Sequence, residues 1–330
     1  MKLAVELFKA MSRDKSCRVG EFNLGGFQAI RLENEFVQAD VLPELGGRLW
    51  NLLHKPTGRQ WLWHNPCVAL RTAAPGSSYD DQWAGGWEEL FPNDAPGEFM
   101  GRNLPDHGEW WSRPWQWQVE DRTDEQVGVR LWRDGAVTRT RCVKRFILAD
   151  HSSQLSVRYR IANLGAEPLY FLFKQHLAVA VDSDCRLDLP GGKVTPVDLS
   201  FSTRIGESGP FPWPTARGKA GETVDLTVLP PVQQAHREFV YVSELPEGWC
   251  GVRDLRTGAS LKLRFSLRTF PYVWIFMTFG GWRNLYTVVL EPCTNMPKDL
   301  KQALGDGRCA VLSPKENLEC DVRAVLSSGA

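Results

Sequence analysis

The strongest constraint on the fold is a recurrence of short segments with the composition of β-strands, separated by turns at intervals of roughly 8 to 14 residues. Residues 26–32 and 35–42 predict a hairpin around Glu33 and Asn34, and residues 272–278 and 286–291 predict two strands near the C-terminus. Glycine, proline, asparagine and aspartate lie between such segments. Alternating strands and long helices, which would indicate a parallel sheet, are missing from the pattern. The sequence therefore predicts an all-β sandwich with few short helices.

Two segments depart from the strand pattern. Residues 1–14 place apolar side chains at a spacing that suits a short amphipathic helix or an edge strand. Residues 296–304 predict a helix that begins near Pro297 and continues through Asp299, Leu300 and Leu304. No internal repeat, linker or low-complexity run divides the chain. We therefore expect residues 1–330 to form a single β-sandwich domain.

The charge composition limits the partners that the protein can have. Lysine plus arginine and aspartate plus glutamate both number 39, so the formal net charge is zero. A nucleic-acid or anionic-membrane partner would favour an excess of basic residues. We therefore expect a small-molecule ligand, no nucleic-acid or membrane partner, and a monomer or a homodimer.

The N-terminal segment, the apolar runs and the cysteines indicate the cellular compartment. The N-terminal segment carries Glu6, Lys9 and Arg13 within its apolar part, which does not suit a secretory signal. No apolar run reaches the roughly 18 residues of a membrane-spanning helix. The eight cysteines include no CxxC pair, so neither a zinc cluster nor any other metal site is predicted. These features indicate a reduced, cytoplasmic protein.

Residues 85–117 hold an unusual concentration of tryptophan, at positions 87, 110, 111, 115 and 117. Prolines and glycines interrupt this stretch too often for a helix, so it predicts long loops between short strands. An indole ring is large and flat and carries one N–H donor, which suits a wall that contacts a ligand. We expect some of these rings to close the end of the sandwich and others to line a binding site.

Three residues stand out as candidates for acid–base chemistry. His107 lies within the tryptophan-rich loops, and His176 interrupts an apolar strand together with Lys174, with which it shares one strand face. Glu291 ends the apolar strand 286–290, where a carboxylate is costly to bury unless it is paired or used. A structural hydrogen bond explains a lone buried histidine about equally well. Facing each other across a pocket, however, a glutamate and a histidine could act as general base and general acid.

Five segments resemble, in order, characteristic stretches of the aldose 1-epimerase (galactose mutarotase) superfamily. They are a Gly-Gly turn with two strands, a Phe-Pro-Asn loop, a His-Gly loop, a strand with a second histidine, and a strand ending in Glu-Pro: 42–63, 85–96, 106–115, 173–179 and 288–300. The resemblance spans about residues 20–326. It implies a large antiparallel β-supersandwich, with a sugar bound in a cleft on a concave sheet.

The resemblance also implies a reaction that needs no cofactor. A base removes the proton from the C1 hydroxyl of a cyclic aldose while an acid protonates the ring oxygen, and the opened chain rotates and closes on its other face. The resemblance implies that Glu291 is the base, that His176 is the acid at the ring oxygen, and that His107 assists near that oxygen. The substrate contacts expected beside this trio are Arg48, Trp87, Asn93, Asp94, Trp111, Arg113 and Lys174.

Several departures from the family pattern leave the substrate open. Asp94 stands where many relatives have arginine, and Cys293 replaces the glutamine that usually follows Glu-Pro. The aspartate that many members use on a sugar hydroxyl has no clear match, although Asp254 and Glu244 lie in the right region. The cations Arg48, Arg71, Arg113, Lys174 and Arg283 could recognise an acidic or phosphorylated sugar, because guanidinium groups fit such anions.

Two other functions remain open at this point. The first is a glycoside- or uronate-cleaving hydrolase or lyase on the same fold, for which carboxylates are available at Glu88, Glu89, Asp94, Asp106 and Glu109. The second is a sugar-binding protein without catalytic activity, since some expected sugar contacts are missing.

Overall fold

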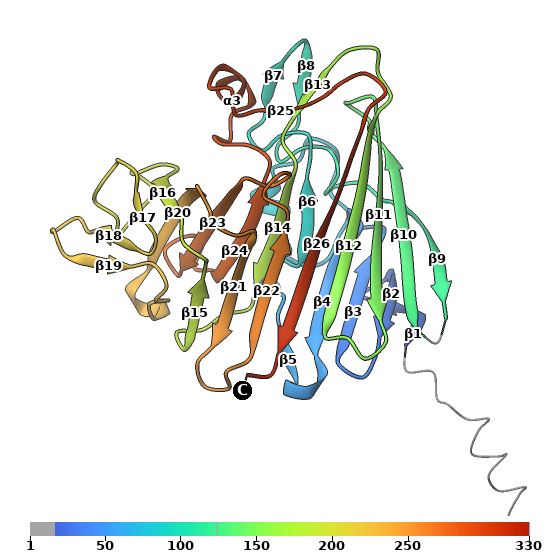
Figure 1. Cartoon of the computed structure of the whole chain (residues 1–330), viewed down its shortest axis with the longest axis horizontal. Helices are drawn as coiled ribbons and strands as arrows, with labels where there is room; N and C mark the ends of the chain where they lie inside the picture. The colour runs from blue at the N-terminus through green and yellow to red at the C-terminus, as the bar shows by residue number, and fades with distance from the viewer. Residues whose placement is uncertain (1–16, 124, 330) are drawn as a thin grey trace, which may run out of the picture.

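A computed structural model describes residues 17–123 and 125–329. The expected helix or edge strand within residues 1–14 lies outside this range. Two antiparallel sheets face each other and make up most of the molecule (Figure 1). The all-β prediction is therefore confirmed, and the sheets are as extensive as the supersandwich fold implies.

The larger sheet has 12 strands, and its centre is formed by segments far apart in the sequence. Its spatial order is β1 (Arg18–Leu24), β2 (Phe27–Glu33), β3 (Val37–Leu42), β4 (Arg48–His54), β6 (Trp87–Leu90), β14 (Lys174–Val179), β24 (Tyr286–Cys293), β23 (Tyr272–Phe279), β20 (His236–Ser243), β16 (Lys193–Pro196) and β17 (Phe211–Pro212), with β5 (Arg59–Gln60) paired to β4.

The smaller sheet has eight strands, in the order β15 (Cys185–Asp188), β21 (Trp249–Asp254), β22 (Ser260–Phe265), β26 (Asn317–Ser327), β12 (Gln154–Asn163), β11 (Thr140–Ala149), β10 (Gln126–Asp134) and β9 (Gln116–Arg122). Burial along β11 and β12 alternates strictly, because one face packs on the core and the other meets solvent.

The remaining elements are short. Three two-stranded pairs are formed by β7 (Gly97–Phe99) with β8 (Arg102–Leu104), β13 (Leu169–Phe171) with β25 (Ala310–Leu312), and β18 (Thr215–Arg217) with β19 (Thr223–Asp225). The helical segments are α2 (Tyr79–Gln82), α3 (Leu300–Gly305), η1 (Lys55–Thr57) and η2 (Val232–Gln234). The predicted helix at 296–304 is thus present but starts later, where Asp299 caps it by accepting a hydrogen bond from the Gln302 amide. No helix within 17–123 and 125–329 is long and apolar enough to cross a membrane.

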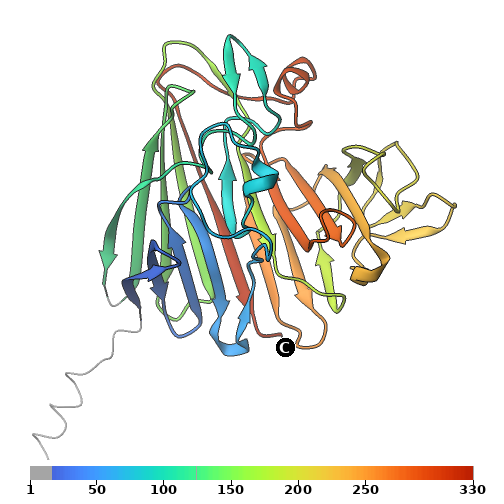
Figure 2. The same ribbon diagram turned by 180° about the vertical axis from the view of Figure 1, so that it is seen from behind.

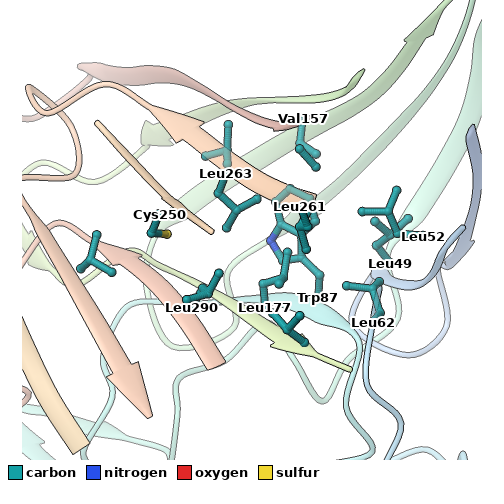
Figure 3. Packing of buried hydrophobic residues seen from close by; sticks show 14 of the residues in the cluster. Leu49, Leu52, Leu62, Trp87, Val157, Leu177, Cys250, Leu261, Leu263 and Leu290 are labelled. Carbon is teal, nitrogen blue, oxygen red and sulfur yellow. The ribbon is translucent and has the colours of Figure 1, made fainter. Parts of the chain in front are cut away.

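The core lies between the two sheets. Trp87, Leu177 and Leu290 of the larger sheet point toward Val157 and Leu261 of the smaller one, as Figure 3 shows. All of these side chains are at most 1% exposed. Apolar burial of this kind is the main favourable term in folding, and it fixes which face of each central strand looks inward.

The outward face of the larger sheet is also covered at its centre. Every residue of β14 and β6 is buried, so neither strand shows the alternation of a half-solvated strand. Seen from behind, long loops from the first third of the chain cross in front of this part of the sheet (Figure 2). Polar side chains on the covered outward face must therefore find partners, and they form the candidate site.

Candidate functional site

A cleft of about 230 Å³ lies on the covered face of the larger sheet and gathers ionisable and aromatic side chains. Its floor comes from β14, β24, β23 and β20, and its walls come from α2 and from loops. The lining residues are Tyr79, Asp80, Trp83, Asp94, His107, Lys174, His176, Val197, Asp198, Phe201, Phe239, Phe276, Trp282, Glu291 and Lys298. This volume lies just below the roughly 300–1,000 Å³ of sites for drug-sized ligands.

Strand register brings two of the three catalytic candidates together. His176 pairs with Glu88 of β6, and the register between β14 and β24 places His176 opposite Glu291. Glu291 in turn pairs with Trp274 of β23. Directly opposite residues on adjacent strands have Cβ atoms about 5 Å apart. The imidazole and the carboxylate therefore project side by side from the floor of the cleft.

His107 reaches the same cleft from the loop in front of the sheet. Two backbone hydrogen bonds hold this loop, from the His107 amide to the Asp94 carbonyl at 2.8 Å and from the Glu109 amide to the Phe91 carbonyl at 2.7 Å. His107 has φ of 57°, and Gly108 follows with φ of 79°. Positive φ is unfavourable for a residue with a side chain, and such strain is typical of functional positions. A Cβ atom on Gly108 would lie 2.2 Å from the Phe91 carbonyl oxygen, so this approach requires glycine.

Lys174 is the electrostatic centre of the site. Its Nζ lies 2.5 Å from Asp94 Oδ2 and 2.5 Å from Glu291 Oε2, and 4.3 Å from the centre of the Trp274 ring. All three charged side chains are buried. Burial opposes the charge on Lys174, but the two carboxylates outweigh it, so the pKa of Lys174 lies above its ordinary value. The ammonium therefore stays charged and holds both carboxylates in place.

The two carboxylates differ in their response to this cation. Burial raises the pKa of Glu291, and Lys174 offsets only part of that effect, so its pKa lies above the ordinary 4.5. Burial also acts on Asp94, but Lys174 and His107 outweigh it, and the pKa of Asp94 lies below its ordinary value. Asp94 is thus the more strongly ionised of the two, and Glu291 is the better proton acceptor.

The two histidines have opposite electrostatic environments. Burial lowers the pKa of His176 well below 6.5, and the positive charge of Lys174 lowers it further. Burial acts in the same direction on His107, but Asp94 and Asp106 outweigh it and raise its pKa above 6.5. His107 Nδ1 lies 2.7 Å from Asp106 Oδ1, and the ring stacks on Tyr79 with centroids 4.0 Å apart. Near neutral pH, His176 is therefore neutral and His107 is the better proton donor.

A buried hydrogen-bond chain fixes the proton on His176. The Tyr79 hydroxyl lies 2.5 Å from Glu88 Oε1 and 3.1 Å from His176 Nδ1, and Arg48 pairs with Glu88 Oε2 at 2.5 Å. Burial raises the pKa of Tyr79 well above 10, so the phenol keeps its proton. Because the phenol donates that proton to the carboxylate, His176 Nδ1–H donates to the phenol oxygen. The unprotonated Nε2 of His176 is then a hydrogen-bond acceptor.

Five of the expected substrate contacts lie away from the cleft. Trp87 faces the core, where its indole N–H donates to Gln175 at 2.9 Å, because β6 turns this residue toward the smaller sheet. Trp111 donates to the Asp106 carbonyl at 3.0 Å and supports the loop from behind. Asn93 donates to the carbonyls of Ala95 and Pro105 and closes the same loop.

The two arginines are also placed differently from the prediction. Arg48 is buried and pairs with Glu88 behind the cleft, and Arg113 lies outside the lining. Of the seven expected contacts, the structure brings only Asp94 and Lys174 to the cleft. The tryptophan-rich stretch closes the sandwich instead of lining the site: Trp87, Trp110 and Trp115 are packed in the core.

Several other residues that line the cleft were not predicted from the sequence. The aromatic part of the wall comes from Trp83, Phe201, Phe239, Phe276 and Trp282, which belong to four separate segments of the chain. Periodicity gave no signal for Phe276, because β23 is covered on both faces. Phe201 belongs to the Gly- and Pro-rich segment 199–222, where composition alone predicts only a long loop at a rim.

Most of the carboxylates considered for glycoside cleavage form hydrogen bonds or ion pairs outside the cleft. Glu88 bonds to Arg48 and Tyr79, and Glu89 bonds to Lys144 and Tyr159 between the sheets. Glu109 accepts four hydrogen bonds from residues 136–138 and anchors a loop. Of the five, only Asp94 lines the cleft. In residues 17–123 and 125–329, no group of three histidines, cysteines or acids is arranged to hold a metal ion.

The comparison with solved structures defines the class of fold. A galactose mutarotase-like protein from Clostridium acetobutylicum superposes with a TM-score of 0.65 at 15% identity, covering 96% of this chain and 100% of that one. A galactose mutarotase related enzyme from Lactobacillus acidophilus gives a TM-score of 0.63 at 13% identity, covering 91% and 98%. The molecule thus has the galactose mutarotase-like β-sandwich fold.

Sequence comparison then identifies the family. The chain belongs to the family described as a domain of unknown function, DUF5107, whose model matches residues 21–218. This match includes His107, Lys174 and His176 but ends before Glu291. No curated protein sequence matches the chain.

One structural neighbour carries the fold within a longer chain. It is a TPR-domain containing protein from Parabacteroides distasonis, with a TM-score of 0.65 at 16% identity. The alignment covers 92% of this chain but 48% of that one, so this chain spans about half of its length. At identities this low, the structural similarity shows the fold alone, and the chemistry has to be inferred from the residues of the site.

Proposed function

We propose that the protein is a sugar 1-epimerase that exchanges anomers by general acid–base ring opening. The observation that carries this proposal is the convergence of Glu291, His176 and His107 on one sugar-sized cleft, from two neighbouring strands and a loop. The structural neighbours named as mutarotases have the same fold, which agrees with this reaction. We also expect it to use no cofactor.

The electrostatics favour a division of roles different from the one that the family resemblance implies. Glu291 accepts the proton of the C1 hydroxyl through the oxygen that Lys174 leaves uncovered, while His107, as imidazolium, protonates the ring oxygen. The ring opens, the C1–C2 bond rotates, and the reverse transfers close the ring on its other face. His176 is neutral and accepts a hydrogen bond from a substrate hydroxyl through Nε2. General acid–base catalysis of this kind contributes about 10²–10⁴-fold.

Bond cleavage fits the site less well. Lys174 contacts both Asp94 and Glu291, so their nearest oxygens lie within about 5 Å, close to the spacing of a retaining glycosidase. However, the ammonium occupies the space between them, where the scissile bond would have to lie. The same ammonium lowers the pKa of Asp94 and keeps it ionised, so Asp94 is not available as the protonated acid that this reaction needs.

The test is the substitution Glu291→Gln. It keeps the shape of the side chain but removes the base, so anomer exchange measured by NMR on the best of a panel of aldoses should fall at least about 10²-fold. Circular dichroism checks that the variant is folded, and mass spectrometry checks that no bond is cleaved. Undiminished exchange by the folded variant would overturn the assignment of the base, and products of altered mass would overturn the reaction class.

A further inference from the structure

The floor of the cleft has two chemically different rows. The first row contains His176, Glu291 and Trp274 at one level of the sheet. Two residues further along each strand, on the same face, lie Val289 and Phe276, which pair with each other. Two residues span about 6.8 Å along an antiparallel strand. The floor therefore changes from ionisable to apolar over about the width of one sugar ring.

Aromatic rings continue from this second row into the wall. Phe276 contacts Phe239, Phe201 and Trp282, with ring centroids 5.7, 5.7 and 5.3 Å apart. Trp282 in turn lies 6.3 Å from Trp83. The rings of Phe201, Phe239, Phe276 and Trp282 are all partly exposed although they line a cleft. Arg237 and Arg283 lie over the rings of Phe201 and Trp282, 4.8 and 5.0 Å from their centres, and the remaining exposed ring area forms an apolar surface in the cleft.

Polar groups border the aromatic surface. Asp80 precedes Trp83 on the α2 side, Asp198 precedes Phe201, and Lys298 also lines the cleft. Lys298 is exposed and has no ion pair among the residues that the structure describes. Asp198 already accepts two hydrogen bonds from Ser200, but a purely apolar group on the aromatic surface would offer no partner to Asp80 and Lys298. A sugar ring has an apolar C–H face and hydroxyl edges, and it would satisfy both kinds of lining.

We infer that the cleft contains a second sugar subsite, formed by Phe276, Phe239, Phe201 and Trp282, and that the substrate is a reducing disaccharide or a longer reducing oligosaccharide. This inference rests on the proposed function. The reducing ring lies at Glu291 and His107, and the next ring stacks on the aromatic surface about 7 Å further along the sheet. Phe239 pairs with Phe276 on the neighbouring strand, and their ring centroids lie 5.7 Å apart, so the surface is wide enough for that ring.

The first experiment compares anomer exchange of glucose and galactose with that of maltose, cellobiose and lactose. Stacking of the second ring should raise kcat/KM for at least one disaccharide about fivefold or more above its monosaccharide. The double substitution Phe276→Ala and Trp282→Ala should lower this ratio toward one. Trp249→Ala is the matched control, because Trp249 lies on β21 outside the cleft lining, and it should leave the ratio unchanged.

A second experiment separates the subsite from the reaction. Methyl glycosides cannot ring-open, so calorimetric binding of methyl maltoside and methyl glucoside reports the subsite alone. Tighter binding of the maltoside, lost in the double variant but kept in Trp249→Ala, supports the subsite even if no sugar shows anomer exchange; that combination would refute only the proposed function. Equal binding of both glycosides, together with no kinetic preference for any disaccharide, would overturn the subsite.

Discussion

Replacing Lys174 by methionine tests whether this ammonium holds the site together. Methionine keeps most of the volume and removes the charge, so Asp94 and Glu291 are left within about 5 Å of each other without their cation. Removing one partner from a buried ion pair typically costs about 3–5 kcal/mol. Two neighbouring carboxylates also cannot both ionise easily, so the pKa of at least one should rise.

The expected loss can be converted into a shift of the melting temperature. Unfolding entropy is about 2.1 cal/mol/K per residue, or about 0.7 kcal/mol/K for a chain of 330 residues. A loss of 3–5 kcal/mol therefore corresponds to a decrease of about 4–7 °C. The assay is thermal unfolding at pH 7.5 and pH 5. The control is Lys193→Met, which breaks an exposed pair with Glu244 at 3.3 Å and should cost no more than about 1 kcal/mol.

The pH dependence gives the sharper result. A carboxyl whose pKa is raised in the folded state favours folding at low pH and loses that contribution as the pH rises through the folded value. The deficit of Lys174→Met relative to the unmodified protein should therefore be larger at pH 7.5 than at pH 5. Adding Asp94→Asn should recover part of the loss at pH 7.5, because one of the opposed charges is gone. A deficit equal at both pH values, or no larger than that of Lys193→Met, would refute the reasoning.

Two further predictions concern the loop that carries His107. The pH profile of kcat/KM for anomer exchange should be bell-shaped, because the base must be deprotonated and the acid protonated. Its acid limb should have a pKa above 4.5, from Glu291, and its basic limb a pKa above 6.5, from His107, since both pKa values are raised. His107→Gln should abolish the basic limb and His176→Gln should keep it; the reverse result would return the acid role to His176. Gly108→Ala should destabilise the protein by about 2 kcal/mol or more in chemical denaturation, because its new Cβ would overlap a carbonyl oxygen; the control Gly101→Ala has a similar φ of 72° but no atom within 4 Å, so equal losses would show that the close approach is unimportant.

The residues proposed for the active site could be recognised in the sequence from their chemical types. A histidine and a lysine on one face of an apolar strand, and a glutamate at the end of another, are expensive to bury without a use. Their chemistry was therefore visible before their positions were known. The supersandwich was implied by the resemblance of five segments, in order, to the aldose 1-epimerase superfamily, whereas the all-β class followed from turns and short strands, which are local features.

The same local signals misplaced the binding wall. Tryptophans concentrated in residues 85–117 suggested a ligand surface, yet Trp87 and Trp110 are packed in the core, and the exposed aromatic surface is built from Phe276, Trp282 and Phe201 instead. Strand alternation could not identify Phe276, because both faces of the central strands are covered. The local sequence shows that an aromatic residue is present, but it does not show which residues that ring contacts in the folded protein.

The sequence by itself determined the all-β class, the approximate strands and the identity of the acid–base candidates, because these follow from local periodicity and from residue chemistry. Only the tertiary structure decided that Lys174 lies between Asp94 and Glu291, which are 197 residues apart in number. It also places the two histidines in opposite electrostatic environments, which raise the pKa of His107 and lower that of His176. Both results depend on burial and on charges from distant segments, which meet only when the order of strands β6, β14, β24 and β23 places them in one cleft.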